Sequence, residues 1–271
     1  MISVLNSVSS LSAENALSST ETSLQKSLLQ LSTGLKINSG SDDAAGLSIA
    51  AGLGANISAL TQSSQNASDG VGLLQTADGA LSQVTNLLNR ATTLATEAAN
   101  GGLTTAQSTA ADTEFQSILS EITQIGSTTN FNGTAVFSAT AQTTFTSDGT
   151  TGGTTTTSTT TGALSATSLA LTGNLLTTAA AATSLTAITA AINTVSATRG
   201  SIGASVNQLT ADSSVENTEV TNLTSAQNNV QNADIGTTVA KMTQYNVLEQ
   251  TGMAALSQSN QAQQAVLKLL Q

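Results

Sequence analysis

Residues 235–271 read IGTTVAKMTQYNVLEQTGMAALSQSNQAQQAVLKLLQ, and this stretch decides the fold. Apolar residues recur in it at alternating steps of four and three, the spacing of a helix with a buried face. One line of this spacing contains Ile235, Val239, Met242, Met253, Leu256, Leu267 and Leu270, with polar Asn246, Glu249, Asn260 and Gln263 at the intervening places of the same register. The line beside it contains Tyr245, Leu248, Ala255, Ala262, Val266 and Leu269. Two adjacent apolar lines make a face wider than a two-stranded coiled coil buries. We therefore expect this helix to contact partners on more than one side.

The N-terminal segment has the same periodicity. Its line contains Leu17, Leu24, Leu28, Leu31 and Leu35, preceded by a looser set at Val4, Val8 and Leu11. The plainest arrangement packs the two terminal helices against each other. This pair either closes a monomeric bundle or completes its burial against other copies of the chain, and the width of the apolar face favours other copies.

Composition indicates long helices and excludes much catalytic chemistry. The 271 residues include no His, Cys, Trp or Pro, and aromatic residues are 2% of the chain. The absence of Pro suits uninterrupted helices, and few aromatics predict a thin core of Leu, Ile, Val and Ala along helix seams. Without His or Cys, the chain has no Ser-His-Asp triad, Cys-His pair or thiolate zinc site. We expect no metal and no cofactor.

Close acidic pairs are the remaining candidates for catalysis. They are Asp42 with Asp43, Asp112 with Glu114, and Glu216 with Glu219. Each lies where a helix is expected to begin or on a face expected to be solvated, so helix caps and solvated surface are favoured over acid/base pairs. The sequence therefore predicts that the protein is not an enzyme, although a pocket with a strongly perturbed carboxylate would revive that alternative.

The charge argues against two classes of partner. The net charge is −10, and six Lys and Arg are scattered over the chain, whereas phosphate binding needs clustered basic residues. The same charge argues against anionic membrane surfaces. No apolar run of about 18 residues is evident, and the first ten residues lack the basic start of a secretory signal. We expect no nucleic-acid binding and no membrane insertion.

The periodicity divides the chain into segments. A polar break at 36–43 ends in N-cap residues, and a seven-residue register then runs through Ile57, Leu60, Ala67, Val71, Leu74, Leu81, Leu88 and Ala95. A third helix is expected at about 104–127, with Phe115, Ile118, Ile122 and Ile125 on its seam. Periodicity resumes at Leu185, Ile188, Ile192, Val195, Ile202, Val206 and Leu209, and a lost register step between Val230 and Ile235 marks a joint.

Two features of the middle leave alternatives open. Asn132-Gly133 predicts a hairpin turn, and the Thr, Ser and Gly texture from there to Gly173, with alternation at 135–137 and 169–171, predicts short β-hairpins, with disorder of the run Thr154 to Thr161 as the competing interpretation. These hydroxyls are either bare or carry O-linked sugars. Arg199 falls within a seam, so either the helices are pinched there by Gly200 and Gly203 or the arginine meets a carboxylate.

The predicted fold is mainly α: an elongated rod of long coiled-coil-like helices, with paired N- and C-terminal helices and small β-hairpins in the middle. Residues 1–40 and 235–271 would form a terminal helical domain. Residues 41–137 and 174–234 would form a helical rod domain, and 138–173 a hairpin region with no large outer domain.

Several motifs, in order along the chain, resemble bacterial flagellin. They are LSTGLKINSGSDDAAGLSIA at 31–50, NASDG at 66–70, QTADGAL at 75–81, LATEAAN at 94–100, TNFNGT at 129–134, NADI at 232–235, QA at 261–262 and VLKLLQ at 266–271. The resemblance covers about 1–137 and 185–271.

The resemblance implies a self-assembling subunit of the flagellar filament, secreted through the flagellar type III system and extracellular. The terminal helices would form the inner tube, and polymerisation would use Leu17, Leu24, Leu28, Leu31, Leu35, Ile235, Val239, Met242, Leu248, Met253, Leu256, Val266, Leu267 and Leu270. Implied partners are other copies of the chain, an export chaperone at the C-terminal helix, and hook-associated and cap proteins. A hook–filament junction protein of the same family is the alternative.

The resemblance also implies a possible contact with the innate flagellin receptor of animal hosts. Arg90, Leu94 and Glu114 occupy the family's contact positions, whereas Thr92 and Thr93 replace a charged pair. Because two charged contacts are missing, weak recognition is expected.

Overall fold

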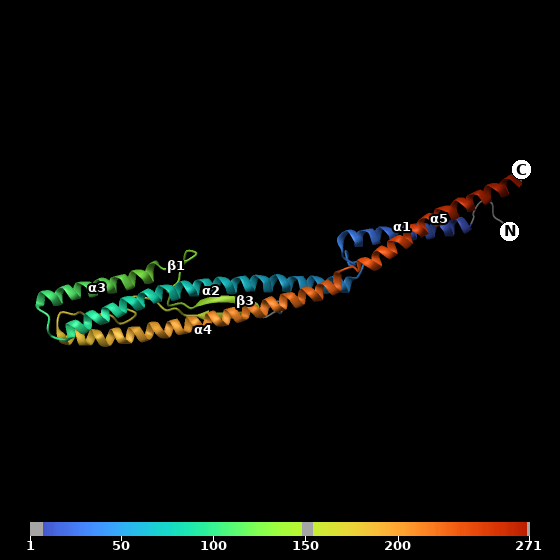
Figure 1. Cartoon of the computed structure of the whole chain (residues 1–271). Helices are drawn as coiled ribbons and strands as arrows, with labels where there is room; N and C mark the ends of the chain where they lie inside the picture. Colours follow the sequence, from blue (N-terminus) through green and yellow to red (C-terminus); the bar gives the residue numbers. More distant parts are fainter. Residues whose placement is uncertain (1–7, 148–153, 270–271) are drawn as a thin grey trace. The chain divides into compact units, whose positions relative to one another are not determined.

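The computed structural model describes residues 8–147 and 154–269 (Figure 1). Its helices are α1 (Val8–Thr33), α2 (Ala44–Ala99), α3 (Thr105–Thr128), α4 (Thr178–Gln231) and α5 (Ile235–Leu269). Its strands are β1 (Asn130–Phe131), β2 (Thr134–Ala135), β3 (Gln142–Ser147) and β4 (Thr154–Thr159). The mainly helical class, the pairing of long helices and the small two-stranded sheets are confirmed.

The chain divides into two compact units. The terminal unit comprises the described parts of Met1–Ala55 and Leu223–Gln271, and the central unit comprises Asn56–Asn222. The terminal unit contains α1, α5 and the segments that join them to α2 and α4. The central unit contains most of α2 and α4, all of α3 and both hairpins.

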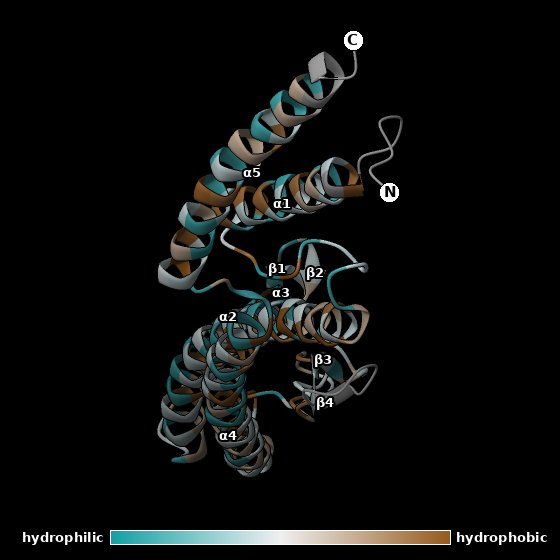
Figure 2. Ribbon diagram, turned by 90° about the vertical axis from the view of Figure 1, so that its right-hand side faces the viewer, coloured by the Kyte–Doolittle hydropathy of each residue, from teal (hydrophilic) through white to brown (hydrophobic). Residues whose placement is uncertain are grey.

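The core of the central unit follows the predicted seams. Leu60, Leu81 and Leu88 of α2, Phe115 and Ile122 of α3, and Ile188, Ile202 and Leu209 of α4 are each at most 2% exposed. Figure 2 views these three helices nearly end-on. A heptad seam buries only about two side chains in seven, so a long helix needs few large core residues, and Leu, Ile, Val and Ala suffice without many aromatics.

The first hairpin forms where the Asn-Gly pair predicts it. Asn130 pairs with Ala135, and Phe131 pairs with Thr134. The turn residues Asn132 and Gly133 have φ values of 50° and 79°, the left-handed conformation that a two-residue type I′ turn requires.

The second hairpin settles the interpretation of the threonine run in favour of strands for the described residues. β3 and β4 pair antiparallel from Gln142 with Thr159 to Ser147 with Thr154. Pairing places Thr146, Thr157 and Thr159 on a buried face. Residues 148–153 lie outside the described residues.

Two expectations were wrong. The alternation at Leu169-Ala170-Leu171 is a turn, not a strand, because Ala170 adopts φ 54° and places both leucines in the core. The expected absence of a long apolar run also fails: α2 and α4 each contain an 18-residue window that is long and apolar enough, by length and composition only, to cross a membrane. Ser, Thr, Gly and Ala, rather than charges, cover much of these helices, which raises their hydropathy.

Candidate assembly surface and interhelical charges

α1 and α5 pack along one heptad line from each helix. The line on α1 contains Ser10, Ala13, Leu17, Thr20, Leu24, Ser27, Leu31 and Gly34, and the line on α5 contains Thr238, Met242, Tyr245, Glu249, Gly252, Leu256 and Ser259, all half-buried or buried. Gly252 allows a close approach, since a Cβ there would lie 3.3 Å from Leu17 Cδ1. Ser10 Oγ and Ser259 Oγ are 2.8 Å apart and share a hydrogen bond. About half of this seam is polar.

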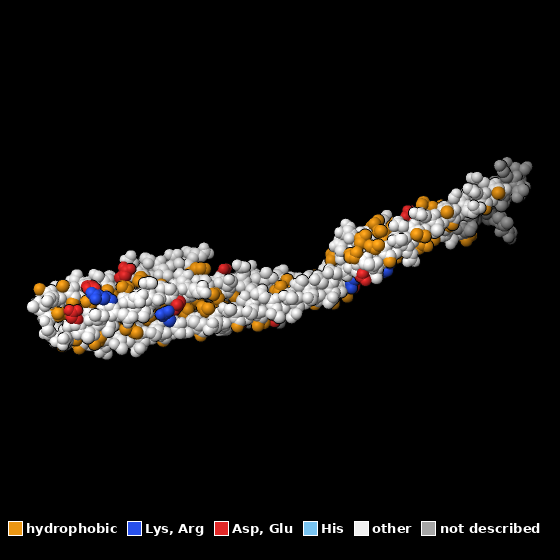
Figure 3. Space-filling view, viewed as in Figure 1, with side chains coloured by type: hydrophobic (Ala, Val, Ile, Leu, Met, Phe, Trp, Pro, Cys, Tyr) orange, Lys and Arg blue, Asp and Glu red, His pale blue; other side chains and the backbone are white. Residues whose placement is uncertain are grey.

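Other large apolar residues of the pair lie outside the seam and are exposed. They are Val8 (80% exposed), Leu11 (60%), Leu28 (47%) and Leu29 (51%) on α1, and Ile235 (49%), Val239 (39%), Val247 (54%), Leu248 (44%) and Met253 (49%) on α5. We call these nine residues the apolar flanks. Figure 3 shows hydrophobic side chains gathered over α1 and α5. Exposed apolar area of this kind marks a surface that another molecule covers.

Some of the predicted polymerisation residues are half-buried near the α1–α5 seam, and others are exposed on the apolar flanks. Leu17, Leu24, Leu31, Leu35, Met242 and Leu256 are half-buried, whereas Leu28, Ile235, Val239, Leu248 and Met253 are exposed. Val266 and Leu267 belong to α5 without a described side-chain environment, and Leu270 lies outside the described residues. The seam runs between the two apolar lines read from the sequence and takes members of both. Each line therefore leaves apolar side chains in water.

Short polar contacts hold together the joints at the base of this pair. Ala233 N donates to Gly34 O (2.8 Å), and Lys36 N donates to Gln231 O (2.8 Å). The loop at 38–42 is closed by Asp42, which pairs with Lys26 Nζ at 2.8 Å and accepts from Asn38 N at 3.1 Å. The Lys26 hydrogen bond, followed by the Asn38 amide, lowers the pKa of Asp42 to about 2.

The N-cap predicted before Ala44 is present, and α5 begins with a cap of the same kind that was not predicted. Asp43 Oδ1 accepts from Gly46 N at 2.9 Å at the start of α2. Asp234 Oδ1 accepts from Gly236 N at 2.9 Å at the start of α5. In each case a carboxylate binds an amide that has no partner within the helix.

Both arginines of the chain form two-pronged ion pairs between helices of the central unit. Arg199 of α4 donates from Nε to Asp78 Oδ1 of α2 at 2.7 Å, so the arginine in the seam does meet a carboxylate. Arg90 of α2 donates from Nε to Glu114 Oε1 of α3 at 2.7 Å. The hydrogen bond from Arg90 lowers the pKa of Glu114. Asp112 is also structural, because its Oδ1 accepts from Leu175 N at 2.8 Å.

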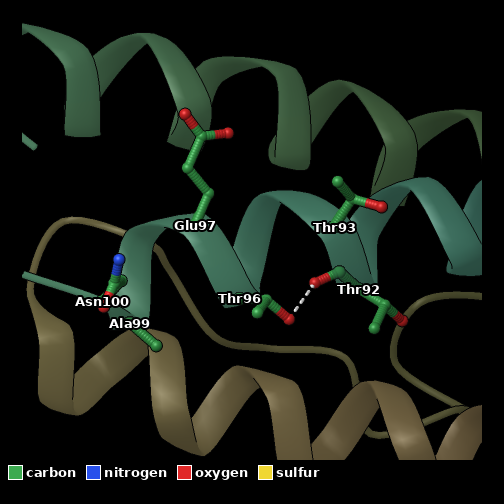
Figure 4. Close-up of a pocket in the computed structure, with 6 residues that line it drawn as sticks. All are labelled: Thr92, Thr93, Thr96, Glu97, Ala99 and Asn100. Atoms are coloured by element: carbon green, nitrogen blue, oxygen red, sulfur yellow. Dashed lines mark hydrogen bonds between the residues drawn. The ribbon is translucent and has the colours of Figure 1, made fainter. Parts of the chain in front are cut away.

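The predicted receptor positions are brought together, but they are largely engaged within the molecule. Arg90 and Glu114 bind each other, and Leu94 is 4% exposed in the core. Figure 4 shows the residues that line a shallow depression on α2: Thr92, Thr93, Thr96, Glu97, Ala99 and Asn100. Thr92 and Thr93 donate to carbonyls one turn back, at Leu88 and Asn89. The depression therefore offers hydroxyls and one carboxylate, without a cation.

Glu216 corrects the expectation that all the acidic pairs are caps or solvated surface. It is 3% exposed, because β3 and β4 cover this part of α4. Its Oε1 accepts a hydrogen bond from Ser63 Oγ of α2, and its Oε2 is buried without a hydrogen-bond partner. Burial, opposed by the Ser63 hydrogen bond and reinforced by nearby Asp212 and Glu219, raises the pKa of Glu216. No sequence pattern signals the burial of Glu216, because that burial depends on which strands cover α4.

The perturbed carboxylate does not assemble into a reactive site. Within residues 8–147 and 154–269, no three His, Cys, Asp or Glu side chains converge as metal ligands. The neighbours of Glu216 are the Ser63 hydroxyl, which donates to its Oε1, and the Ser147 backbone N–H, which donates to Ser63 Oγ. What the arrangement offers is exposed apolar side chains on α1 and α5, and ion pairs that join α2 to α3 and to α4.

Comparisons with known proteins agree with this arrangement. Residues 4–142 match the model of the bacterial flagellin N-terminal helical region, and residues 185–270 match that of the C-terminal helical region. A flagellin of Halalkalibacterium halodurans is 35% identical over 91% of this chain and 91% of its own. A flagellin of Listeria monocytogenes is 31% identical over 89% of this chain and 90% of its own.

A third relative differs in length. The phase 1 flagellin of Salmonella naestved is 41% identical over a stretch that is 51% of this chain but 28% of the Salmonella protein. Family models cover both helical ends of the present chain, and relatives match it almost from end to end. The chain therefore belongs to the bacterial flagellin family and is a non-enzymatic structural subunit of the extracellular flagellar filament that serves motility.

Proposed function

We propose that the apolar flanks of α1 and α5 are the surface through which neighbouring subunits join the filament. The observation that carries this is that the α1–α5 seam is half polar, while the nine flank residues are 39% to 80% exposed. Burying apolar area contributes roughly 25 cal/mol per Å². A second copy supplies the same kind of surface, so one subunit's flanks can cover another's.

The exposed flank makes a prediction about Met253. It is 49% exposed in the subunit, so hydrogen peroxide should convert it to the sulfoxide readily in the monomer and about tenfold more slowly in filaments, since oxidation follows exposure. Mass spectrometry of digested samples gives both rates. Met242 is the internal control, because it already faces α1 and should change less. Equal rates for Met253 in monomer and filament would contradict the proposal.

The same surface also suggests where each unit lies in the filament and which other proteins bind the subunit. The terminal unit would form the inner tube of the filament and the central unit the surrounding shell. An export chaperone would shield the α5 flank before secretion through the type III apparatus, because these apolar side chains are exposed to water in the free subunit. Hook-associated and cap proteins would meet it at the filament ends.

We also propose that the animal flagellin receptor recognises this chain weakly. Arg90 is held by Glu114, Leu94 is buried, and Thr92 and Thr93 bring no charge. Introducing Thr92→Arg with Thr93→Glu should raise signalling potency about tenfold or more, as charged interface contacts commonly contribute 1 to 3 kcal/mol. A reporter-cell dose response measures this. Potency in the unmodified chain equal to that of the double variant would overturn the proposal.

A further inference from the structure

The second hairpin is tied to the helices through a buried carboxylate. Ser147, the last residue of β3, donates its backbone N–H to Ser63 Oγ of α2 at 2.6 Å. Ser63 Oγ donates in turn to Glu216 Oε1 of α4. Figure 1 shows β3 lying along α2 and α4. One short chain of hydrogen bonds thus joins a strand and two helices at a side chain that is 3% exposed.

Apart from this chain, the hairpin is held mainly by polar contacts, among them the hydrogen bond from Asn66 Nδ2 of α2 to Phe145 O at 3.1 Å. The buried residues of its strands are Thr146, Thr157 and Thr159, and the only large apolar side chain of β3 and β4 is Phe145, which is 60% exposed. A cavity of about 50 Å³ lies beneath the hairpin, lined by residues that include Gly70, Leu74 and Thr144. Polar, imperfectly filled contacts contribute much less than an apolar interface.

Two buried polar atoms under the hairpin have no hydrogen-bond partner. They are Thr157 Oγ1 and Glu216 Oε2. Leaving a buried acceptor unpaired is costly, and the cost is larger for a charged oxygen than for a neutral one. The stability of the docked hairpin is therefore sensitive to whether the Glu216 carboxyl is charged.

The charged neighbours of Glu216 oppose its negative charge, whereas the hydrogen bonds from the Ser63 hydroxyl and the Ser147 backbone favour it. On α4, Asp212 and Glu219 stand one turn away on either side and repel it. The nearest ionisable residue on the facing part of α2 is the exposed Asp69, and β3 and β4 contain no ionisable residue. Neither residues 56–89 of α2 nor residues 200–222 of α4 include a Lys or Arg. No Lys or Arg within these stretches therefore offsets the cost of ionisation, and the arginines of α2 and α4, Arg90 and Arg199, are paired with Glu114 and Asp78.

We propose that the β3–β4 hairpin is a proton-controlled latch, docked on α2 and α4 when the Glu216 carboxyl is protonated and released when it ionises. In the docked state, the protonated carboxyl continues the hydrogen-bond chain without bringing a charge into the interface. When the proton leaves, the hairpin must move to admit water to the carboxylate. The device belongs to the central unit and operates in a single subunit.

The direction of the pH effect follows from linkage. Burial raises the pKa of Glu216 in the docked state above the value near 4.3 that a released, solvated glutamate has. Docking is therefore fully favourable below about pH 4.3, and this advantage is lost progressively as the pH rises through the raised value. Mobility of the hairpin should increase from acid to neutral pH.

The chain is suited to a direct test, since it contains no cysteine. Thr156 of β4 is exposed, so Thr156→Cys can carry a single nitroxide label in the full-length monomer. We expect the mobile fraction in the electron paramagnetic resonance spectrum to rise at least threefold between pH 4.5 and pH 8. With Glu216→Gln, which has nearly the same shape but no charge, the fraction should stay at its acid value throughout.

The control and a second variant make the result decisive. Glu121→Gln removes the same charge from an exposed site on α3 and should leave the pH profile unchanged. Asp212→Asn with Glu219→Gln removes the repelling charges and should move the midpoint to lower pH, even if Glu216→Gln were to unfold. A flat profile in the parent chain, a pH-dependent one in Glu216→Gln, or an unmoved midpoint in the double variant would each overturn the latch.

Discussion

Subunits carrying Leu248→Asp or Met253→Asp are expected to form no filaments while keeping the helical circular dichroism of the parent. Both side chains are about half exposed beside the α1–α5 seam, at 44% and 49%, so a carboxylate there stays in water in the monomer. In the filament, the same carboxylate would have to leave water without a partner, which costs several kcal/mol per site. Because every subunit carries the change, the effect multiplies along the assembly.

A matched variant separates charge from position. Gln250→Glu adds the same charge to α5 at a polar, exposed residue outside the flanks and should still polymerise on seeds. Seeded growth followed by light scattering and negative-stain microscopy distinguishes the variants. Normal filaments from Met253→Asp, or loss of filaments from Gln250→Glu alone, would count against the flanks as the joining surface.

The second large effect concerns two helical glycines, whose replacement by alanine should change the free energy of unfolding in opposite directions. A Cβ on Gly126 of α3 would overlap the backbone carbonyl of Leu164, whereas a Cβ on Gly79 of α2 would meet nothing within 4 Å. Gly126→Ala should lower the free energy of unfolding by about 1 to 3 kcal/mol or more, since backbone cannot yield like a side chain. Gly79→Ala should raise it by roughly 0.5 to 1 kcal/mol through helix propensity.

Urea unfolding followed by circular dichroism tests the pair in the same chain. The midpoints should move in opposite directions relative to the parent. If Gly126→Ala were as stable as Gly79→Ala, the loop containing Leu164 would not pack against α3 as described.

The helices were predictable because their evidence is local and repetitive. A seven-residue register held from Leu60 to Ala95 requires a single buried seam, and in the structure its residues are buried except Val71, which is half-buried. The joints were equally readable from breaks in the register, and the polar residues before Ala44 predicted the cap that Asp43 provides. The Asn132-Gly133 turn was predictable because few residue pairs adopt its backbone angles.

Features that depend on packing between distant segments could not be read. The threonine strands show no apolar alternation, so nothing in the sequence indicated that they would cover α4 and bury Glu216. On α5, two apolar lines were equally eligible to face α1, and the seam that forms lies between them. Leu169 and Leu171 imitate a strand, yet both reach the core from a turn because Ala170 adopts a left-handed conformation.

The most direct test of the central claim is to compare limited proteolysis of monomers and filaments. The central unit contains the whole buried cluster from Ala67 to Leu209, whereas α1 and α5 bury only a half-polar seam. Short helix pairs of this kind barely offset an ordering cost of roughly 1 to 2 kcal/mol per residue. Proteases should therefore trim both ends of the monomer, leaving a soluble helical core that no longer polymerises on seeds, and should spare those ends in filaments. Long filaments grown from the trimmed core would contradict the account, because assembly would then not depend on α1 and α5.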